Sequence, residues 1–248
     1  MKPRTRLCLS TILIFCLSAC SEKFSRSSQA AFKQPSTWAP LLAATIIAAA
    51  DKDTKISEWA QDKTPVFGSM QDAVTASNNL VDSLVISAGV SALFIPDHSA
   101  ESDLLPTNVE FFLIEGIGLS VNSGITSRLK SLAERNRPNQ QDQRSFPSGH
   151  TSRAFSAANF SKHNIQQLNL TDDTKKYFDL VFDSAAIATG WARVEAGWHY
   201  PTDVLAGSAL GNVVSSIIRD MYLNTTTNVI ISVELLRDRQ RLLFSYAF

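Results

Sequence analysis

The spacing of apolar residues predicts a chain made mostly of α-helices. Between residues 38 and 222, apolar positions recur every three or four residues, which is the period of one face of a helix. The clearest case is the segment whose apolar side chains form a single stripe: Leu210, Val213, Val214, Ile217, Ile218 and Met221. The pattern predicts helices over residues 41–50, 74–93, 109–133, 148–161, 174–191 and 202–222. Residues 51–68 are expected to be a loop, and a single turn of helix within it is left open.

Two of these segments are apolar enough to be compared with membrane spans. Residues 41–50 are too short, because a spanning helix needs about 20 apolar residues. We interpret them as a buried helix. Residues 109–133 contain Glu110, Glu115 and Asn122 along with several small residues, which favours close packing in a soluble core over contact with lipid.

The period changes at the C-terminus. Residues 229–235 and 241–248 are rich in β-branched, leucine and aromatic side chains, and they flank a polar Arg-Asp-Arg turn. This predicts a β-hairpin over about residues 228–248, packed on the helical body. The fold class is therefore mainly α, with a C-terminal β-hairpin.

The N-terminus has the organisation of an exported protein. Basic residues precede a short apolar run that ends in Leu-Ser-Ala-Cys at residues 17–20, which is typical of a signal peptide over residues 1–19. This ending resembles the lipobox of bacterial lipoproteins, which implies lipidation of Cys20. An ordinary signal peptide cut nearby is the alternative. Because Ser21 is not the aspartate of inner-membrane lipoproteins, the resemblance implies an outer-membrane lipoprotein with its domain in the periplasm.

Composition limits the partners of the remaining chain. We predict a flexible tether over residues 20–37, which are polar and serine-rich, and a single domain over residues 38–248. The 248 residues include 23 basic and 23 acidic side chains, and this zero net charge argues against a nucleic-acid partner. The membrane is an expected partner through lipidated Cys20.

Candidate chemistry centres on Pro147-Ser148-Gly149-His150, where a loop passes into a predicted helix. Free N–H groups at a helix start favour an anion, and we expect those of Ser148 and Gly149 to face one. His150 would stand beside that anion as a proton donor.

Cations flank this motif in sequence. Lys130 and Arg137 are seven positions apart, so both can lie on one helix face, and Arg193 follows later in the chain. Arginine and lysine side chains match phosphate oxygens. We interpret Glu195, two residues after Arg193, as a surface acid.

A second histidine has a carboxylate at helical spacing. His199 and Asp203 are four positions apart, and Pro201 suits the first turn of a helix between them. Asp203 can then reach one ring nitrogen of His199 and leave the other as a nucleophile. Cations, a loop for an anion and two histidines point to phosphoryl transfer without a metal ion.

Together these residues resemble the three-part signature of the type 2 phosphatidic acid phosphatase superfamily, which includes bacterial class A acid phosphatases and vanadium haloperoxidases. The resemblance covers residues 130–203 and implies the helical bundle of that family. It implies that His199 attacks phosphorus, that Asp203 orients it, and that His150 protonates the leaving group. Phosphate would be bound by Lys130, Arg137, Ser148, Gly149 and Arg193. Ala192 departs from the family, which usually has serine there.

We therefore expect a phosphomonoester hydrolase of the acid phosphatase or phosphatidate phosphatase kind, with a phosphohistidine intermediate and no metal cofactor. Lipid phosphates or other phosphomonoesters of the cell envelope are the expected substrates, and vanadate is an expected inhibitor. One alternative is a vanadium haloperoxidase, with vanadate as prosthetic group. Another is a catalytically silent envelope lipoprotein.

Overall fold

The fold is a mainly helical bundle. The structure is a computed structural model that describes residues 21–99, 105–223, 229–236 and 239–246. A helix over residues 21–33 comes first. The later elements are α2 (Pro35–Ala49), α3 (Asp53–Lys63), α4 (Met70–Leu93), α5 (Thr107–Ala133), α6 (Gly149–Gln167), α7 (Asp172–Glu195), α8 (Pro201–Ile218), a π-helical turn η1 (Arg219–Leu223), β1 (Val229–Leu236) and β2 (Arg239–Tyr246).

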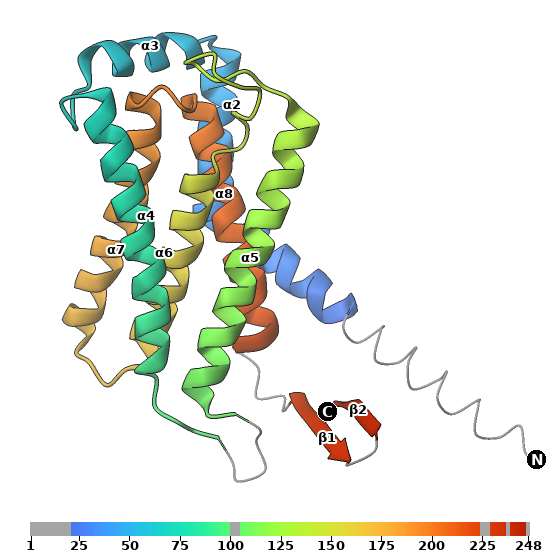
Figure 1. Cartoon of the computed structure of the whole chain (residues 1–248). Coiled ribbons are helices and arrows are strands. Elements are labelled where there is room, and N and C mark those ends of the chain that lie inside the picture. Colours follow the sequence, from blue (N-terminus) through green and yellow to red (C-terminus); the bar gives the residue numbers. More distant parts are fainter. Residues whose placement is uncertain (1–20, 100–104, 224–228, 237–238, 247–248) are drawn as a thin grey trace, which may run out of the picture.

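Helix α6 lies at the centre of the bundle and contacts α4, α5, α7 and α8 (Figure 1). Close approach of α8 depends on glycines. A Cβ atom at Gly207 would lie 2.5 Å from the Ser148 carbonyl oxygen, and one at Gly211 would lie 2.4 Å from that of Ser152. Both distances are too short for any side chain. The start of α6 is therefore pressed directly against α8.

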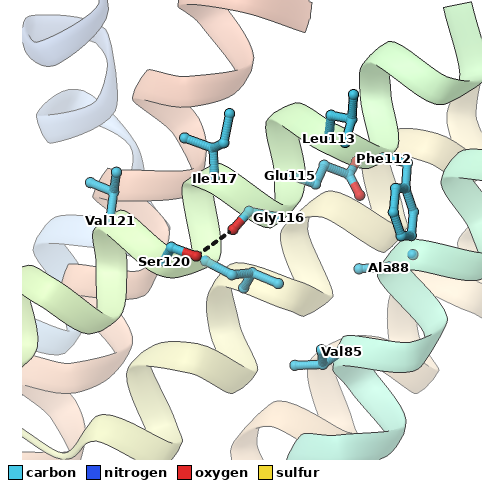
Figure 2. Close-up of a pocket in the computed structure, with 11 residues that line it drawn as sticks. Val85, Ala88, Phe112, Leu113, Glu115, Gly116, Ile117, Ser120 and Val121 are labelled. Atoms are coloured by element: carbon cyan, nitrogen blue, oxygen red, sulfur yellow. Dashed lines mark hydrogen bonds between the residues drawn. The ribbon is translucent and has the colours of Figure 1, made fainter.

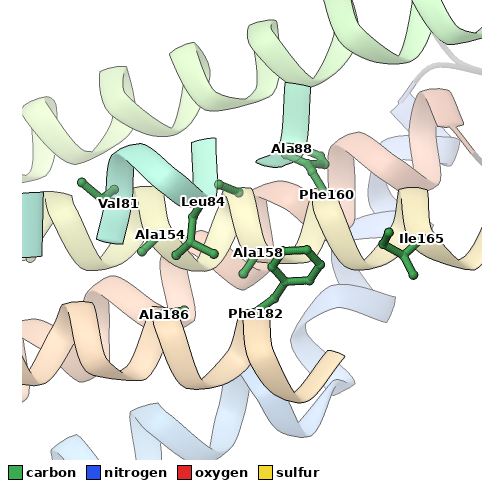
Figure 3. Close-up of a cluster of buried hydrophobic side chains, with 10 residues drawn as sticks. Val81, Leu84, Ala88, Ala154, Ala158, Phe160, Ile165, Phe182 and Ala186 are labelled. Carbon is green, nitrogen blue, oxygen red and sulfur yellow. The ribbon is translucent and has the colours of Figure 1, made fainter. Parts of the chain in front are cut away.

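The hydrophobic core lies where α4, α6 and α7 meet (Figure 3). Small residues on α6, Ala154, Ala157 and Ala158, are buried there among the larger side chains of Leu84 and Phe160. Burying a leucine or phenylalanine side chain contributes about 1.5–3 kcal/mol. The alanines let the helices approach closely enough for those side chains to pack.

The structure confirms the mainly helical prediction and corrects some of its details. Residues 53–63, expected to be loop, form α3, which lies across one end of the bundle against α7 and α8. Helix α2 includes residues 41–49 of the predicted segment 41–50, but most of its large apolar side chains are exposed rather than buried, with Ile46 at 59%. Residues 21–33, expected to belong to a flexible tether, are helical.

That N-terminal helix has contacts with the end of α8. Lys23 Nζ donates to the Met221 carbonyl oxygen at 2.5 Å, and Ser216 Oγ donates to Gln34 Oε1 at 3.0 Å. Ala31 is fully buried. Apolar and polar contacts with the bundle thus order a segment whose composition alone predicts flexibility. Residues 1–19 and Cys20 lie outside the described residues.

Helix α5 has an unusual distribution of side chains. Its buried face holds Glu115, Gly118, Asn122 and Thr126, while Ile117 is 59% exposed. Glu115 and Asn122 therefore face the neighbouring helices, whereas Glu110 and several large apolar side chains are exposed, in contrast to the close core packing expected for residues 109–133. Within the part of the chain that the structure describes, no helix combines the length and apolar character needed to cross a membrane.

The C-terminal residues form two antiparallel strands. β1 pairs with β2 so that Val229 lies opposite Tyr246 and Leu236 opposite Arg239. The expected packing of this hairpin on the helical body concerns side chains outside those described and stays a prediction.

Candidate active site

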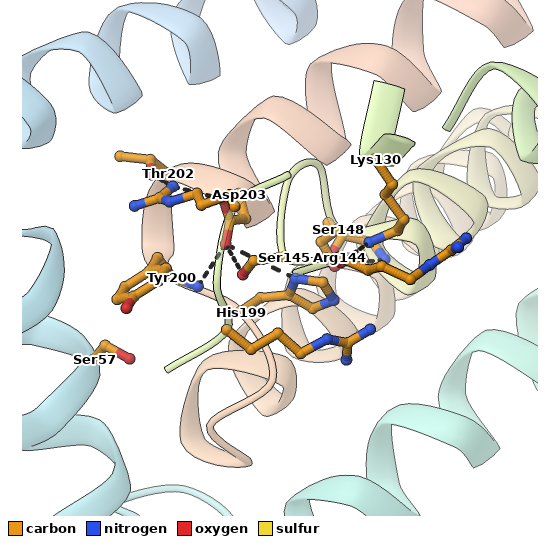
Figure 4. Close-up of polar contacts among 12 residues, drawn as sticks. Ser57, Lys130, Arg144, Ser145, Ser148, His199, Tyr200, Thr202 and Asp203 are labelled. Carbon is orange, nitrogen blue, oxygen red and sulfur yellow. Dashed lines mark hydrogen bonds and ion pairs between the residues drawn. The ribbon is translucent and has the colours of Figure 1, made fainter. Parts of the chain in front are cut away.

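The predicted site residues come together at one end of the bundle. They are contributed by the C-terminal ends of α5 and α7, the N-terminal ends of α6 and α8, and the loops between these helices (Figure 4). The two loops are joined by a backbone hydrogen bond of 3.0 Å from Asn139 to Gly197. Site residues that are up to 73 positions apart in the sequence, from Lys130 to Asp203, therefore lie close together.

His199 lies on the loop between α7 and α8 and is only 2% exposed. Its backbone N–H donates to the Arg193 carbonyl oxygen at 3.2 Å, which ties the loop to the end of α7. Burial lowers the pKa of His199 to about 4, and the nearby charges of Lys130 and Arg193 act in the same direction. The imidazole is therefore neutral near pH 7.

Asp203 is fully buried in the first turn of α8, where donors surround its carboxylate. Oδ2 accepts from Ser145 Oγ at 2.5 Å and from the Tyr200 backbone N–H at 2.9 Å, and Oδ1 accepts from Arg135 at 2.6 Å. Burial alone would raise the pKa of Asp203, but contacts with His199, Ser145 and Arg135 outweigh it and hold the pKa below its usual value. The carboxylate stays ionised.

The predicted contact between Asp203 and His199 has ion-pair geometry. Asp203 Oδ2 lies 3.9 Å from His199 Nδ1, which is too long for a hydrogen bond. Among the described residues, Nδ1 has no hydrogen-bond partner. A small movement of the ring would close this distance, and Asp203 is the carboxylate that faces it.

His150 lies in the first turn of α6 and is half-buried. Its Nε2 lies 3.0 Å from Asn78 Oδ1 on α4, and because a carbonyl oxygen only accepts, Nε2 carries the hydrogen. Burial lowers the pKa of His150 to about 3, and the charge of Arg193 contributes next. A bound phosphate dianion would oppose that charge and favour protonation.

The three predicted cations surround the histidines. Lys130 Nζ donates to the Arg144 carbonyl oxygen at 2.5 Å, and Arg193 Nη1 donates to Ser77 Oγ at 3.2 Å. Arg137 forms an ion pair with Asp142 at 2.6 Å. Burial, followed by the charge of Arg137, lowers the pKa of Lys130 to about 8 and that of Arg193 to about 10. Buried cations that repel one another favour an anion between them.

Trp198 holds two of these cations in place. The Arg137 and Arg193 guanidinium carbons lie 4.5 and 4.9 Å from the centre of its ring system. Such cation–π contacts contribute about 0.5–2 kcal/mol each. The indole therefore fixes both guanidinium groups and forms part of the wall of the site.

The serine–glycine motif differs from the prediction in one detail. The Ser148 backbone N–H donates to the Asp203 carbonyl oxygen at 2.9 Å, so it is not available for an anion. The Ser148 hydroxyl accepts from Thr151 Oγ1 at 2.8 Å and caps α6. Gly149 lies beside Lys130, since a Cβ atom there would be 3.8 Å from Lys130 Cε. The Gly149 N–H and the Ser148 hydroxyl remain as donors.

Part of the chain is similar to a known protein family. Residues 111–226 match the PAP2 superfamily. The matched region contains all of the predicted site residues of the bundle. A search of curated proteins gave no significant match.

Two solved structures align with this chain, one of them with a TM-score above 0.5. A transmembrane PAP2-type phosphatidylglycerolphosphate phosphatase from Bacillus subtilis aligns with a TM-score of 0.57 at 21% identity, over 75% of this chain and 95% of that chain. LpxE from Aquifex aeolicus aligns with a TM-score of 0.37 at 23% identity, over 43% of this chain and 66% of that chain. The first alignment shows that the bundle has the fold of a PAP2 phosphatase.

Several residues around the candidate site were not predicted from the sequence. Arg135 contacts Asp203, and three residues that precede the matched region also reach the site: Asp53, Ser77 and Asn78. No local pattern indicates these contacts, because each joins positions far apart in the chain. The spacing of Lys130, Arg135 and Arg137 near one helix end was the only available signal for Arg135.

Glu195 is a correction to the sequence analysis. We expected a surface acid, but the side chain is fully buried. Its carboxylate accepts from the Val66 and Phe67 backbone N–H groups at 3.0 and 3.1 Å and from Trp191 Nε1 at 2.5 Å. Glu195 thus fastens the loop before α4 to the end of α7 that carries Arg193.

Ala192, where the resemblance led us to expect serine, lies in a small apolar cluster with Ala73 and Ala196. It is fully buried. The position therefore contributes to packing behind Arg193.

Away from the histidines, α4 and α5 line an open, mostly apolar pocket of ≈ 470 Å³ (Figure 2). Glu115 lies at its edge and is 2% exposed, and neither carboxylate oxygen has a hydrogen-bond partner among the described residues. Burial raises the pKa of Glu115 to about 8. In the described part of the chain, no group of three or more His, Cys, Asp or Glu side chains is arranged to hold a metal ion.

Proposed function

We propose that this protein is a phosphomonoester hydrolase that acts without a metal ion and through a phosphohistidine intermediate. The observation that carries the proposal is the pairing of a buried, neutral His199 with Asp203 on one side of a site surrounded by Lys130, Arg137 and Arg193. A neutral imidazole backed by a carboxylate is a nucleophile. Fixed cations stabilise the charge of a phosphoryl group in transfer.

In the first step, His199 Nε2 attacks phosphorus while Nδ1–H donates to Asp203. A P–N bond forms, the P–O bond to the leaving alcohol breaks, and His150 gives its proton to the departing oxygen. In the second step, His150 takes a proton from water, the water oxygen attacks phosphorus, and the P–N bond breaks. Phosphate is released and both histidines return to their initial states.

We infer lipid phosphates, or other phosphomonoesters of the cell envelope, as substrates. The similar Bacillus subtilis structure is that of a phosphatidylglycerolphosphate phosphatase, which supports a lipid phosphate. The sequence before Ser21 supports a bacterial outer-membrane lipoprotein anchored at Cys20, with the domain in the periplasm. We expect vanadate, which resembles phosphate, to inhibit the enzyme.

The proposal is tested by trapping the intermediate. Wild-type protein should release phosphate from phosphatidate and from an aryl phosphate in the presence of a chelator. Acid-labile, base-stable phosphate should be found on His199 after rapid quenching. The His199→Ala variant should lose roughly 10⁴-fold in kcat and form no phosphoenzyme. Substantial turnover by that variant, or halide oxidation by peroxide in place of phosphate release, would overturn the proposal.

A further inference from the structure

Two charged residues that the proposed mechanism does not use, Arg135 and Asp53, connect α3 to the carboxylate that faces His199. Arg135 Nη2 lies 2.5 Å from Asp53 Oδ2, and Nη1 lies 2.6 Å from Asp203 Oδ1. One guanidinium therefore bridges two carboxylates. Burial would lower the pKa of Arg135, but the charges of Asp203 and Asp53 outweigh it and raise the pKa.

Asp53 also holds the start of α8. Its Oδ1 accepts from the Thr202 backbone N–H at 3.0 Å, and its Oδ2 accepts from Thr202 Oγ1 at 2.6 Å. Thr202 lies in the first turn of α8, where backbone N–H groups have no acceptor within their own helix. Asp53 supplies that acceptor from the first residue of another helix, and so sets where α8 begins.

Arg135 also contacts Thr202 and Tyr200. Nη1 donates to Thr202 Oγ1 at 2.8 Å, and the guanidinium carbon lies 4.3 Å from the centre of the Tyr200 ring. With Asp53 on one side and Asp203 on the other, the guanidinium group has little freedom to move. A planar group with several donors in fixed directions suits this role better than a lysine ammonium.

The orientation of Asp203 depends on these contacts. Ser145 and Tyr200 both donate to Oδ2, whereas Arg135 donates to Oδ1 and so holds the other oxygen of the carboxylate. A rotation of the carboxylate would move Oδ2 relative to His199 Nδ1, which lies 3.9 Å away. Loss of Arg135 would also leave a fully buried carboxylate with one donor fewer.

We propose that Arg135 and Asp53 are positioning residues that hold the Asp203 carboxylate in the orientation that directs His199. Helix α3, which precedes the region matched to the PAP2 superfamily, is then part of the active site. This inference rests on the proposed function, in which His199 is the nucleophile.

The charges around His199 allow this role to be separated from a merely structural one. Lys130 on α5, His150 on α6, Arg193 on α7 and Asp203 on α8 face the imidazole, and Arg135 and Asp53 act on it through Asp203. Without Arg135, the full charge of Asp203 would act on His199 and raise its pKa. Without the charge of Asp53, Arg135 would neutralise more of Asp203 and lower the pKa of His199. The two changes have opposite signs.

The experiment compares Arg135→Gln and Asp53→Asn in the full chain, by histidine NMR titration of His199 and by the pH dependence of kcat/KM. Titration of His199 and the acidic limb of kcat/KM should move to higher pH in Arg135→Gln and to lower pH in Asp53→Asn. We expect kcat to fall roughly 10²-fold in Arg135→Gln, since displacing a catalytic group by about 1 Å has that effect, and to fall less in Asp53→Asn.

Matched controls lie on the same two helices. Arg128 on α5 and Glu58 on α3 are exposed, so Arg128→Gln and Glu58→Gln remove the same charges at a distance from the site. Shifts of the same sign in both test variants, shifts no larger than those of the controls, or an unchanged kcat would overturn the inference.

Two further measurements keep the result interpretable. If Arg135→Gln does not fold, Arg135→Lys retains the charge but not the bridge, and should lower kcat while leaving the titration of His199 near that of wild type. Wild-type kcat in that folded variant would count against the inference. If His199→Ala is active, the proposed function fails, whereas the NMR titration still shows whether Arg135 and Asp53 act on His199.

Discussion

The two histidines of the site have different surroundings. His199 is buried on a loop and faces Asp203, a carboxylate held by three donors, whereas His150 is half-buried on a helix and faces Asn78, a neutral amide. A carboxylate stabilises the positive charge that an attacking imidazole develops. An amide fixes the ring without adding a negative charge, so His150 can release its proton easily. The partner of each histidine therefore matches the role we propose for it.

The largest difference between the His199 and His150 variants should appear when the leaving group of the substrate is varied. In the proposed mechanism, loss of His199 removes the nucleophile for every substrate, but loss of His150 removes only the proton donor. We expect His150→Ala to lower kcat/KM roughly 10²–10⁴-fold for an alkyl phosphate and much less for an aryl phosphate, whose leaving oxygen needs little protonation. Steady-state rates on the two substrates measure the difference.

The His199→Ala variant serves as the comparison in that experiment, because its loss should be equally severe on both substrates. If His150→Ala also lost activity equally on both, His150 would not be the acid on the leaving-group side.

A smaller effect is expected at Asn78. Removing one hydrogen bond of about 0.5–1.5 kcal/mol frees the His150 ring, so Asn78→Ala should lower kcat roughly 2- to 10-fold for an alkyl phosphate. The decrease should again be smaller for an aryl phosphate. Asn79→Ala is the matched control, since Asn79 is the exposed neighbour on α4. A loss that is the same for both substrates would show that Asn78 does not act through His150.

The smallest effect on rate, and a measurable one on stability, is expected at Glu115, far from the histidines. Its pKa rises from 4.5 to about 8 on folding, so its contribution to stability is present below pH 4.5 and is lost as the pH rises toward 8. Relative to Glu115→Gln, the wild-type free energy of unfolding should fall across that range, by a few kcal/mol at most. Denaturant titrations at several pH values test this.

Activity of Glu115→Gln near pH 7 should equal that of wild type. A stability difference that does not change with pH would mean that Glu115 ionises normally in the folded protein.

The sequence was informative where function depends on local spacing. Asp203 lies in the first turn of α8, His199 lies two positions before that helix, and Ser148 caps α6, so these placements follow from local spacing around helix starts. The long helices follow from periodicity. Contacts between distant segments have no such signal: Thr202 donates to Asp53 across 149 positions, and Arg193 to Ser77 across 116.

Short polar helices were also beyond prediction. Helix α3 has few apolar residues, and its position depends on tertiary contacts such as that of Asp53 with Arg135. Glu195 illustrates the same limit, since its burial depends on backbone N–H groups of residues 66 and 67, which pair with it only after folding.

The helix over residues 21–33 determines how far the active site lies from the expected attachment point of the chain at Cys20. Its first residues contact Met221, just beyond the C-terminal end of α8, whereas Asp203 lies in the first turn of α8. At 1.5 Å per residue, the 18 residues of α8 separate these ends by about 27 Å. With attachment at Cys20, an upright bundle would hold the histidines that far above the bilayer surface and admit phosphates from solution. A bundle lying along the surface would instead bring them to the height of lipid headgroups.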